Sequence, residues 1–525
     1  MRHDLQVSLP RLRWLILAAI LLLLTGAFLF SLREGVSPYI RDRFVKVLKE
    51  RFESEVDLKN FQISLFPHVR ASGEELVLRH KGRTDVPPFI SVKRFWAETG
   101  LWGLFSVPKQ VRMVRLEGLQ IHVPPREHKG KGLRDEKRLN TVPSFVIQEI
   151  NADGTLLQIL PKKEGKQPLE FDISKLTLHS AGKGVPMSFR ATLTNPKPPG
   201  LIQSAGKFGP WQGDEPGLTP VSGNYTFQNA DLSVFRGIAG VLSSEGKYQG
   251  VLERIQVEGQ TDTPDFLVKT SGTPVHLKTN FKAIVDGTNG DTLLEPVKAQ
   301  IISSLLIANG GVTGTRGVKG KTVSLFVTVG EAKLEDLLRL AVKSAQPPMT
   351  GIVNFKTQFR LPPGDQDIVD KLYLDGVFGV QAARFSSFKV QEKVKNLSRR
   401  GKGQVEDTGS GNVVSDLKGA FTLKEGVITF SKLSFGVPGA LVQLNGTYGL
   451  RNEEFDFRGT LRLDAKLSET TSGIKAFLLK AIDPLFKRKD AGAVIPIKVA
   501  GTRREPSFGL DIARTLSGKR DQQTD

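Results

Sequence analysis

The 525-residue chain contains no cysteine. Without a thiol it has no thiolate nucleophile, which excludes the chemistry of cysteine-dependent enzymes. A chain without cysteine also suits a compartment in which a stray thiol would be oxidised. The absence therefore favours placing the bulk of the chain outside the cytoplasm.

Recognisable catalytic and metal-binding spacings are absent as well. The seven histidines are scattered, and no His-Glu-x-x-His or Gly-x-Ser-x-Gly motif occurs. His122 and His128 lie close together in sequence, but no acidic pair stands beside them at ligand spacing. The sequence therefore predicts a protein that is not an enzyme and that holds no metal or cofactor.

Two segments resemble ligand-binding loops without completing the motif. Residues 314–322 (GTRGVKGKT) end like a phosphate-binding loop, but Thr315 stands where that motif begins with glycine, and an alternating strand follows instead of a helix. Residues 286–291 (DGTNGD) do not have the acid spacing of an EF-hand calcium loop. We interpret the first segment as a basic hairpin turn and the second as a turn.

Long apolar runs are absent except for one. Residues 14–32 carry no charge, and nineteen helical residues extend about 28 Å, which is close to the hydrocarbon thickness of a bilayer. The large side chains at the end of the run do not suit cleavage as a signal peptide. We expect an uncleaved single-pass membrane anchor that includes Trp14, Leu17, Leu21, Leu24, Phe28 and Leu32.

The charge pattern leaves two questions open. Arginines flank the apolar run on both sides, so the positive-inside rule does not decide the orientation, and we favour a cytoplasmic N-terminus. The formal net charge of +20 suits contact with anionic lipid headgroups, but it equally suits a basic surface that keeps the protein soluble. No zinc-finger, RRM or basic-helix motif supports nucleic-acid binding.

From Val56 onward the hydrophobic period is two, which predicts strands. Before it, residues 37–52 have helical spacing and predict a short amphipathic helix. Few crossover helices separate the strands, so the pattern predicts a mainly β, antiparallel architecture rather than a βαβ fold. Hairpin turns are expected at Asn289-Gly290, Asn309-Gly310-Gly311, Lys424-Glu425-Gly426 and Asn445-Gly446.

Two segments, 353–361 and 455–467, alternate most clearly between an apolar and a polar face. The second has thirteen residues, longer than a usual strand, so we expect a bend or bulge at Gly459. Helices are expected at 331–345, 388–398 and 473–488, the last kinked by Pro484, and loops at 125–140, 195–220 and 399–412.

The order of several weak motifs resembles that in AsmA-like proteins. Residues 419–446 form a glycine-punctuated series of strands, and residues 491–508 end in Gly501-Thr502 followed by Pro506-Ser507-Phe508, similar to the C-terminal region of that family. A single anchor, a helix and Leu65-Phe66-Pro67 resemble the family's N-terminal segment, and residues 248–291 resemble part of its large members. The resemblance divides the chain into a cytoplasmic tail (1–13), the anchor (14–32), an N-terminal AsmA-like helix and strands (36–130), a central β-groove (141–400), an AsmA-like C-terminal region (413–512) and a polar tail (513–525).

The resemblance implies the fold and function of bridge-like lipid-transfer proteins. It implies an elongated, curled antiparallel sheet with a few short helices, whose apolar groove carries phospholipid between inner and outer membrane without catalysis. The chain is then anchored in the inner membrane, with its bulk in the periplasm of a Gram-negative-type bacterium and the outer membrane or an envelope protein at its distal end. The alternating strands supply the groove candidates Val353, Phe355, Phe359, Phe421, Leu423, Val442, Leu444, Phe455, Phe457, Leu461 and Leu463.

Other interpretations remain open for the same residues. The alternating strands equally suit an ordinary sandwich core without a ligand. The function equally suits an envelope scaffold or assembly factor for outer-membrane proteins that conducts no lipid. The helix expected at 473–488 either contacts the far membrane or packs on a sheet. About 25 strands at about 4.8 Å spacing extend roughly 120 Å, which falls short of the opposite membrane, so either a partner at the distal end or a shuttle arrangement is also expected.

Overall fold

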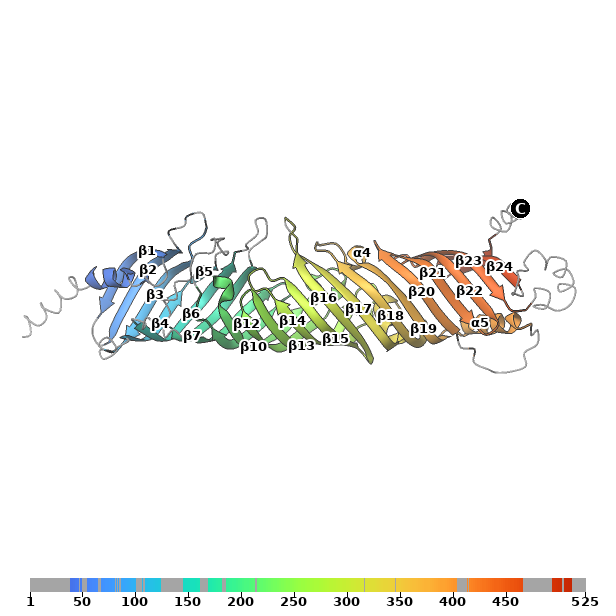
Figure 1. The fold of residues 1–525 in the computed structure, drawn as a ribbon, viewed down its shortest axis with the longest axis horizontal. Coiled ribbons are helices and arrows are strands. Elements are labelled where there is room, and N and C mark those ends of the chain that lie inside the picture. The colour runs from blue at the N-terminus through green and yellow to red at the C-terminus, as the bar shows by residue number, and fades with distance from the viewer. Residues whose placement is uncertain are drawn as a thin grey trace, which may run out of the picture.

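The computed structural model shows a mainly β protein whose strands follow one another along one long axis (Figure 1). It describes residues between 38 and 511, apart from short gaps and longer ones at 124–144, 161–168, 404–412 and 466–492. The expected anchor at 14–32 and the expected helix at 473–488 therefore lie outside the described residues. Within the described part, no helix is long and apolar enough to cross a membrane.

The strands of the N-terminal half begin after a helical segment described at residues 38–46 and 48–49. They alternate between exposed and less exposed side chains, as the period-two pattern predicts. Their bounds are β1 Ser54–Ser64, β2 Val69–His80, β3 Ile90–Thr99, β4 Lys109–Glu117, β5 Gln120–Val123, β6 Phe145–Ile159, β7 Leu169–Ala181, β8 Met187–Pro196, β9 Pro199–Phe208, β10 Pro220–Asp231, β11 Ile238–Ala239, β12 Val241–Val251 and β13 Arg254–Val268. Two single 3-10 turns, Pro216–Leu218 and Leu232–Val234, flank β10.

The strands of the C-terminal half are interrupted by three short helices. The strands are β14 Val275–Val285, β15 Thr292–Ile301, β16 Ser304–Gly314, β17 Lys321–Lys333, β18 Met349–Leu361, β19 Tyr373–Phe385, β20 Ser415–Lys424, β21 Val427–Val437, β22 Ala440–Gly449, β23 Glu454–Leu463, β24 Ala493–Thr502 and β25 Pro506–Leu510. The helices are α3 Leu334–Ala341, α4 Ile368–Lys371 and α5 Phe388–Gly401. Helices α3 and α5 fall within or across the segments 331–345 and 388–398, where helices were expected.

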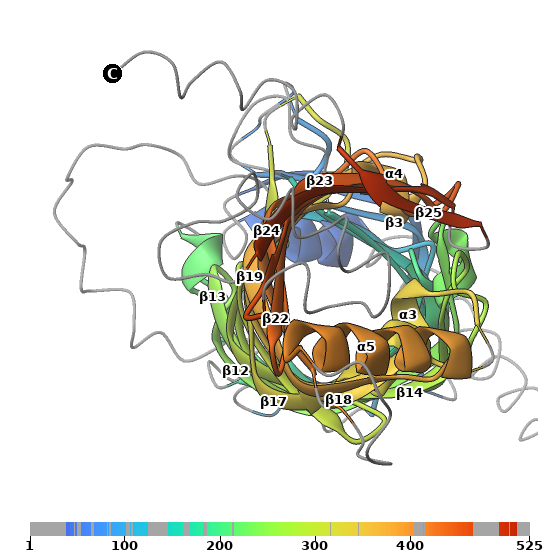
Figure 2. The ribbon, with the colours of Figure 1, turned by 90° about the vertical axis from the view of Figure 1, so that its right-hand side faces the viewer.

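All the described strands belong to one curled sheet rather than to two packed sheets. Viewed along the long axis, the sheet wraps around a central space, with α4 and α5 on opposite sides of it (Figure 2). Neighbouring strands pair antiparallel from β6 to β25, apart from the short β11, which pairs with β13. This arrangement confirms the mainly β prediction and differs from the sandwich alternative.

The expectation of a purely antiparallel sheet is wrong at one place. β4 and β5 run in the same direction, separated by a turn at Gly118, and both pair parallel with β6. The chain reaches β6 from β5 through residues 124–144, which is long enough for a parallel crossover. The sheet is therefore mixed, because the local alternation does not reveal the direction in which a long connection returns.

The strand ends form two long rims. The rim that carries α4 also holds the turns β12–β13, β14–β15, β16–β17, β20–β21 and β22–β23, and we call it the α4 rim. The opposite rim carries α3 and α5 together with the turns β13–β14, β15–β16 and β21–β22, and we call it the α5 rim. Antiparallel succession explains this division, since every second connection returns to the same side of the sheet.

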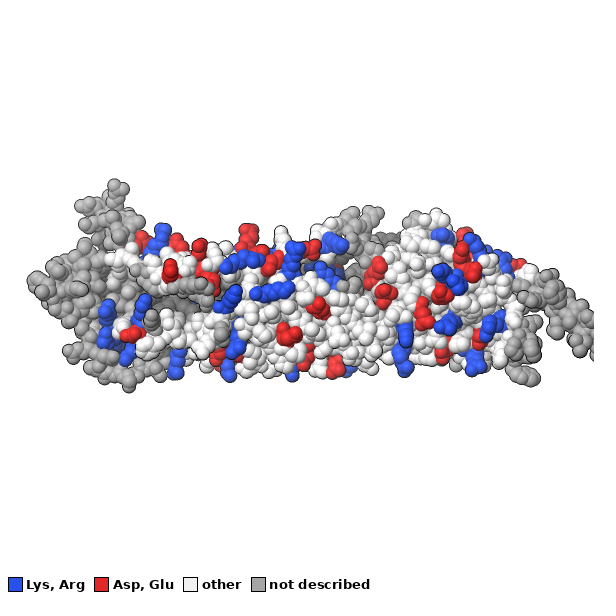
Figure 3. Space-filling view, turned by 180° about the vertical axis from the view of Figure 1, so that it is seen from behind, with Lys and Arg blue, Asp and Glu red and all other residues white. Residues whose placement is uncertain are grey.

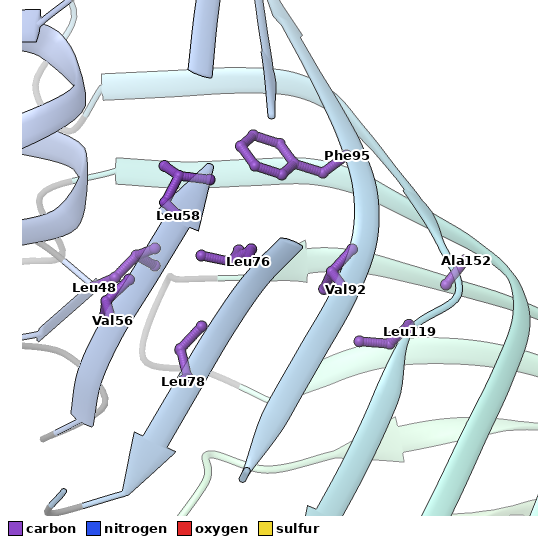
Figure 4. Packing of buried hydrophobic residues seen from close by; sticks show 9 residues of the cluster. All are labelled: Leu48, Val56, Leu58, Leu76, Leu78, Val92, Phe95, Leu119 and Ala152. Atoms are coloured by element: carbon purple, nitrogen blue, oxygen red, sulfur yellow. The ribbon is translucent and has the colours of Figure 1, made fainter. Parts of the chain in front are cut away.

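Buried apolar clusters occur where a helix packs on the inner face. At the N-terminal end, Leu48 from the helical segment joins Leu58 and Phe95 (Figure 4). Phe44 from the same segment stacks on Phe61 and Phe95, with ring centroids 5.9 and 5.8 Å apart. Two further clusters lie beneath α3 and α5.

Several glycine-based expectations are wrong. The register of β23 with both β22 and β24 runs unbroken through Gly459, so there is no bulge, and the strand ends at Leu463. Gly310 and Gly446 lie inside β16 and β22, not in turns, whereas the turns at Asn289-Gly290 and Lys424-Glu425-Gly426 are confirmed. β9 also occupies the middle of the loop expected at 195–220.

Candidate functional site

The inner face of the C-terminal half of the sheet is mainly apolar, with polar side chains such as Thr357 among the apolar ones. On β18, Val353, Phe355 and Phe359 point to the less exposed face, while Lys356 and Gln358 between them are exposed. Phe355 stands opposite Val329 on β17 and Phe378 on β19, so the apolar rows continue from strand to strand. Alternation within each strand and the register between strands together produce this surface.

A row of phenylalanines crosses this face from β19 to β23. The ring of Phe378 lies 6.0 Å from Phe421 and 6.2 Å from Phe430, and Phe430 lies 5.8 Å from Phe457. Phe455 lies 6.1 Å from Phe457. The structure thus brings together three of the predicted groove residues, and Phe378 and Phe430 join them. These two were missed, although Phe430 alternates with the polar neighbours Thr429 and Ser431 in β21. Phe378 lies between Val377 and Gly379 in β19, so no polar alternation marks it.

The remaining groove candidates occupy different environments. Val442 stands opposite Leu461 and Leu444 opposite Gly459, and all three leucine and valine side chains are half-buried. Leu463 is buried in the cluster beneath α5. Val353 is buried in the cluster beneath α3, and Leu423 is also buried. The half-buried candidates are Phe355, Phe359, Phe421, Val442, Leu444, Phe455 and Leu461.

The inner face has a different character in the middle of the chain. On β9 to β14, three hydroxyl pairs face inward: Ser204 with Tyr248 at 2.7 Å, Tyr225 with Ser244 at 3.1 Å, and Thr261 with Thr279 at 2.7 Å. We call these six side chains the hydroxyl belt. Burial raises the pKa of Tyr225 and of Tyr248 above the ordinary tyrosine value, so both phenols stay protonated at neutral pH.

Glycines on adjacent strands let the two tyrosine rings lie flat against the sheet. A Cβ on Gly246 or Gly259 would lie within 2.9 Å of the Tyr225 side chain, and one on Gly223 would lie 2.7 Å from the Tyr248 hydroxyl. The rings therefore cover glycine backbone instead of projecting toward the opposite wall. The belt was not predicted from the sequence. The sequence feature that could have indicated the belt is the Gly-x-Tyr spacing, which occurs in both β10 and β12.

Among the residues that the structure describes, contacts join the two rims at two places. Phe89, which precedes β3 on the α5 rim, lies with its ring centroid 5.6 Å from Trp211, which precedes β10 on the α4 rim. Farther along, the backbone N–H of Ile368 in α4 donates to the carbonyl of Arg236 on the α5 rim at 3.0 Å. We call these contacts the proximal closure and the central closure.

The outer face carries both signs of charge. Figure 3 shows basic and acidic residues interspersed over the face seen from behind. Two shallow hollows on the outer face enclose about 520 and 580 Å³, and each has charged residues in its lining, such as Arg115 and Asp153 in the first and Arg254 and Asp286 in the second. Their linings do not suit an acyl chain.

The two segments that resemble ligand-binding loops, residues 314–322 and 286–291, lie at turns between strands. Lys321, near the end of segment 314–322, donates to the Asp291 carboxylate at 3.0 Å and to the Asn289 carbonyl at 2.8 Å, so the two turns are joined along the α4 rim. His122 is buried, and its Nδ1 donates to the Pro88 carbonyl at 2.8 Å. His128 lies outside the described residues. Among the residues that the structure describes, no three histidine or acidic side chains are placed to hold a metal ion.

Comparisons with family models, with curated proteins and with solved structures gave no match.

Proposed function

We propose that this chain is a membrane-anchored periplasmic protein that carries phospholipid along the inner face of its curled sheet, between the inner and outer membranes and without catalysis. The resemblance to AsmA-like proteins supports the compartment, the anchor at 14–32 and the two membranes that the path connects. The inner membrane and phospholipids are then its partners, with the outer membrane or an envelope protein at the distal end.

One observation supports the proposal most strongly. Inward apolar side chains such as Phe359, Leu444 and Phe455 are only half-buried, and the described strands belong to one sheet with no second sheet over them. Apolar surface in an ordinary core is covered by another layer. Here the apolar surface is elongated, and no second layer covers it completely. Because the curled sheet also screens this surface from water, it suits an acyl chain.

The energetics favour such a path. A fourteen-carbon chain in water costs on the order of 10 kcal/mol, at about 0.8 kcal/mol per methylene. Contact with the phenylalanine row and its aliphatic neighbours removes most of that cost. The wall thus lowers the barrier to moving a lipid through an aqueous space.

Site-specific photo-crosslinking in the full chain tests the proposal. A benzophenone side chain at inward positions Phe359, Leu444 or Phe455 is expected to form adducts with phospholipid, identified by mass spectrometry. Outward positions Gln358 and Gln443 on the same strands serve as matched controls and are expected to form none. Adducts with protein alone at all three inward positions would contradict lipid carriage.

A second candidate function, a scaffold for outer-membrane protein assembly, has one observation in its favour. Leu305 and Ile307 on β16 and Phe326 on β17 are 47%, 40% and 43% exposed, on the outer face of neighbouring strands. Exposed apolar groups of this kind mark protein contacts. Replacing Ile307 and Phe326 by lysine is expected to leave lipid adducts unchanged. Loss of outer-membrane protein assembly with normal lipid adducts would favour the scaffold.

A further inference from the structure

The central closure consists of several contacts between the two rims. Beside the Ile368 to Arg236 hydrogen bond, Lys197 on the α5 rim lies 3.7 Å from Asp365 in the loop before α4. A Cβ on Gly237 would lie 2.8 Å from the Asp367 carboxylate, so the two segments are in full contact. Burial and the nearby Lys197 lower the pKa of Lys371 in α4.

Helix α4 is itself held in place. The Arg451 guanidinium donates to both oxygens of Asp370, at 2.8 and 2.7 Å, and a second ion pair reaches Asp367 at 3.5 Å. The capping carboxylate of Asp367 also accepts from the N–H of Val369 at 2.9 Å. The element that closes the curl is thus anchored to the β22–β23 turn on its own rim.

The proximal closure uses aromatic packing. Trp211 lies between Phe89 across the opening and Phe208 on its own rim, with ring centroids 5.6 and 6.2 Å away. Phe89 is buried, and its carbonyl accepts from the N–H of His122 at 2.9 Å. Aromatic pairs of this kind contribute beyond their buried area.

Strand β10 connects the two closures. It begins at Pro220, shortly after Trp211, and ends at Asp231, shortly before Arg236. Tyr225 lies near its middle. The hydroxyl belt therefore lies between the two places where the rims meet.

A phospholipid that kept its headgroup outside the curl would have to break both closures to move past them. A lipid that keeps its headgroup inside needs polar partners, because an unpaired phosphate in an apolar space is costly. The belt contains six hydroxyls, and those of Ser204 and Ser244 donate to the carbonyls of Asn224 and Gln260 at 3.0 and 2.9 Å. The phenols of Tyr225 and Tyr248 are therefore the donors that can turn from these serines to a headgroup. The inward neighbours Gly223, Val257 and Phe281 add no charge. Neutral donors bind a phosphate without trapping it as an ion pair would.

We propose that the rims stay joined at both closures during transport and that the phosphate-bearing headgroup passes inside the curl over the hydroxyl belt. The inference rests on the proposed lipid-carrying function. It assigns the belt as a transient site for the phosphoglycerol part of the lipid.

The absence of cysteine makes the closures directly testable. Arg236→Cys with Ile368→Cys, and Phe89→Cys with Trp211→Cys, place thiols across the central and proximal closures of the full-length protein. Glu245→Cys with Gln260→Cys joins opposite residues on β12 and β13 and is the matched control, because it does not cross the opening. A benzophenone at Phe455 reports lipid that has passed both closures.

Adduct yield with phosphatidylglycerol at Phe455 is expected to be the same for oxidised and reduced protein in all three pairs. A loss on oxidation of either closure pair, restored by reductant and absent in the control, would overturn the inference while leaving lipid carriage intact. Absence of lipid adducts in the reduced, unlocked protein would instead contradict the proposed function, and the inference with it.

A second measurement addresses the belt. Tyr225→Phe with Tyr248→Phe removes two hydroxyls with little change of shape, and Ser243→Ala on the outer face of β12 is the control. Phosphatidylglycerol adducts at Phe455 are expected to fall about tenfold, the order of losing hydrogen bonds to a charged group, while diacylglycerol adducts do not change. Wild-type yields with phosphatidylglycerol in the double variant, with the thermal melt unchanged, would overturn the assignment of the belt.

Discussion

At the scale of single residues, glycine sets how closely neighbouring strands approach. A Cβ on Gly459 would lie 1.8 Å from the Gln443 carbonyl oxygen, and one on Gly446 would lie 2.1 Å from that of Asp456. No side chain fits these positions without moving the backbone of the next strand. These glycines therefore allow neighbouring strands to approach closely and do not form turns.

Gly459→Val is expected to destabilise the protein by about 1–3 kcal/mol, the range for inserting a side chain into a well-packed site. The midpoint of urea unfolding, followed by circular dichroism, measures the effect. Gly330→Ala on β17 is the matched control, because a Cβ there has no neighbour within 4 Å. Equal midpoints for the valine variant and the wild type would show that the strand spacing at Gly459 is not fixed.

Glycine also explains why some expectations from the sequence are wrong. Asn289-Gly290 lies in a turn, whereas Asn309-Gly310 lies inside β16. The two dipeptides have the same sequence, so the dipeptide itself does not predict whether it lies in a turn or in a strand. The difference is the neighbouring strand, because a Cβ on Gly310 would lie 2.1 Å from the Ser324 carbonyl oxygen. That contact joins residues distant in sequence and is not visible in the local pattern.

At the scale of elements, short helices are tied to the sheet through a few buried polar bonds. Asp336 in α3 is 5% exposed, and its carboxylate accepts from the N–H of Ser303 at 3.1 Å and from the hydroxyls of Ser303 and Ser304 at 2.7 and 2.8 Å. These bonds attach α3 to the β15–β16 turn on the same rim.

Asp336→Ala is expected to cost about 1–3 kcal/mol, because it leaves buried donors without an acceptor. Asp336→Asn keeps one acceptor oxygen and is expected to recover part of the loss. The thermal midpoint and the rate of proteolysis in residues 334–350 measure both variants. Similar stability for the alanine variant and the wild type would mean that α3 is held by its apolar contacts alone.

The elements themselves were largely predictable. Alternation in β18 and β23 correctly assigned Phe355, Phe359 and Leu461 to one face, because strand periodicity is a local property. Helix α3 followed from its apolar stripe, and a helix was also expected where α5 begins. The parallel pairing of β6 and the position of β9 did not follow, because they depend on how long or proline-rich connections return the chain.

At the scale of the whole molecule, the proposed path is serial, so one obstruction is enough to block it. Leu444→Arg places a charge on the inner face of β22 without touching the closures. Distal lipid adducts at Phe455 are expected to fall on the order of tenfold or more, since an acyl chain has no favourable contact with a desolvated guanidinium. Gln443→Arg, the outward neighbour, is expected to have no effect, and equal losses in both variants would contradict a path along the inner face.

The closures and the hydroxyl belt could not be predicted from the sequence. Phe89 and Trp211, or Arg236 and Ile368, meet only because the sheet curls through a full turn between them. The amount of curl depends on strand tilt and twist summed over many strands, to which each residue contributes little. Local sequence patterns therefore predict which side chains lie on the inner face of the sheet, but not where its two rims meet.

Pairing between successive strands has a consequence for biogenesis. Almost every strand finds its partner in the segment made just before it. A chain that crosses the membrane in order of synthesis, as the proposed topology requires, is therefore expected to build its sheet in order of emergence. The proximal closure then forms once Trp211 has emerged, and the central closure awaits Ile368. Nascent chains stalled after Val251 are expected to resist protease up to β12, whereas degradation of such chains would show that the wall assembles only when complete.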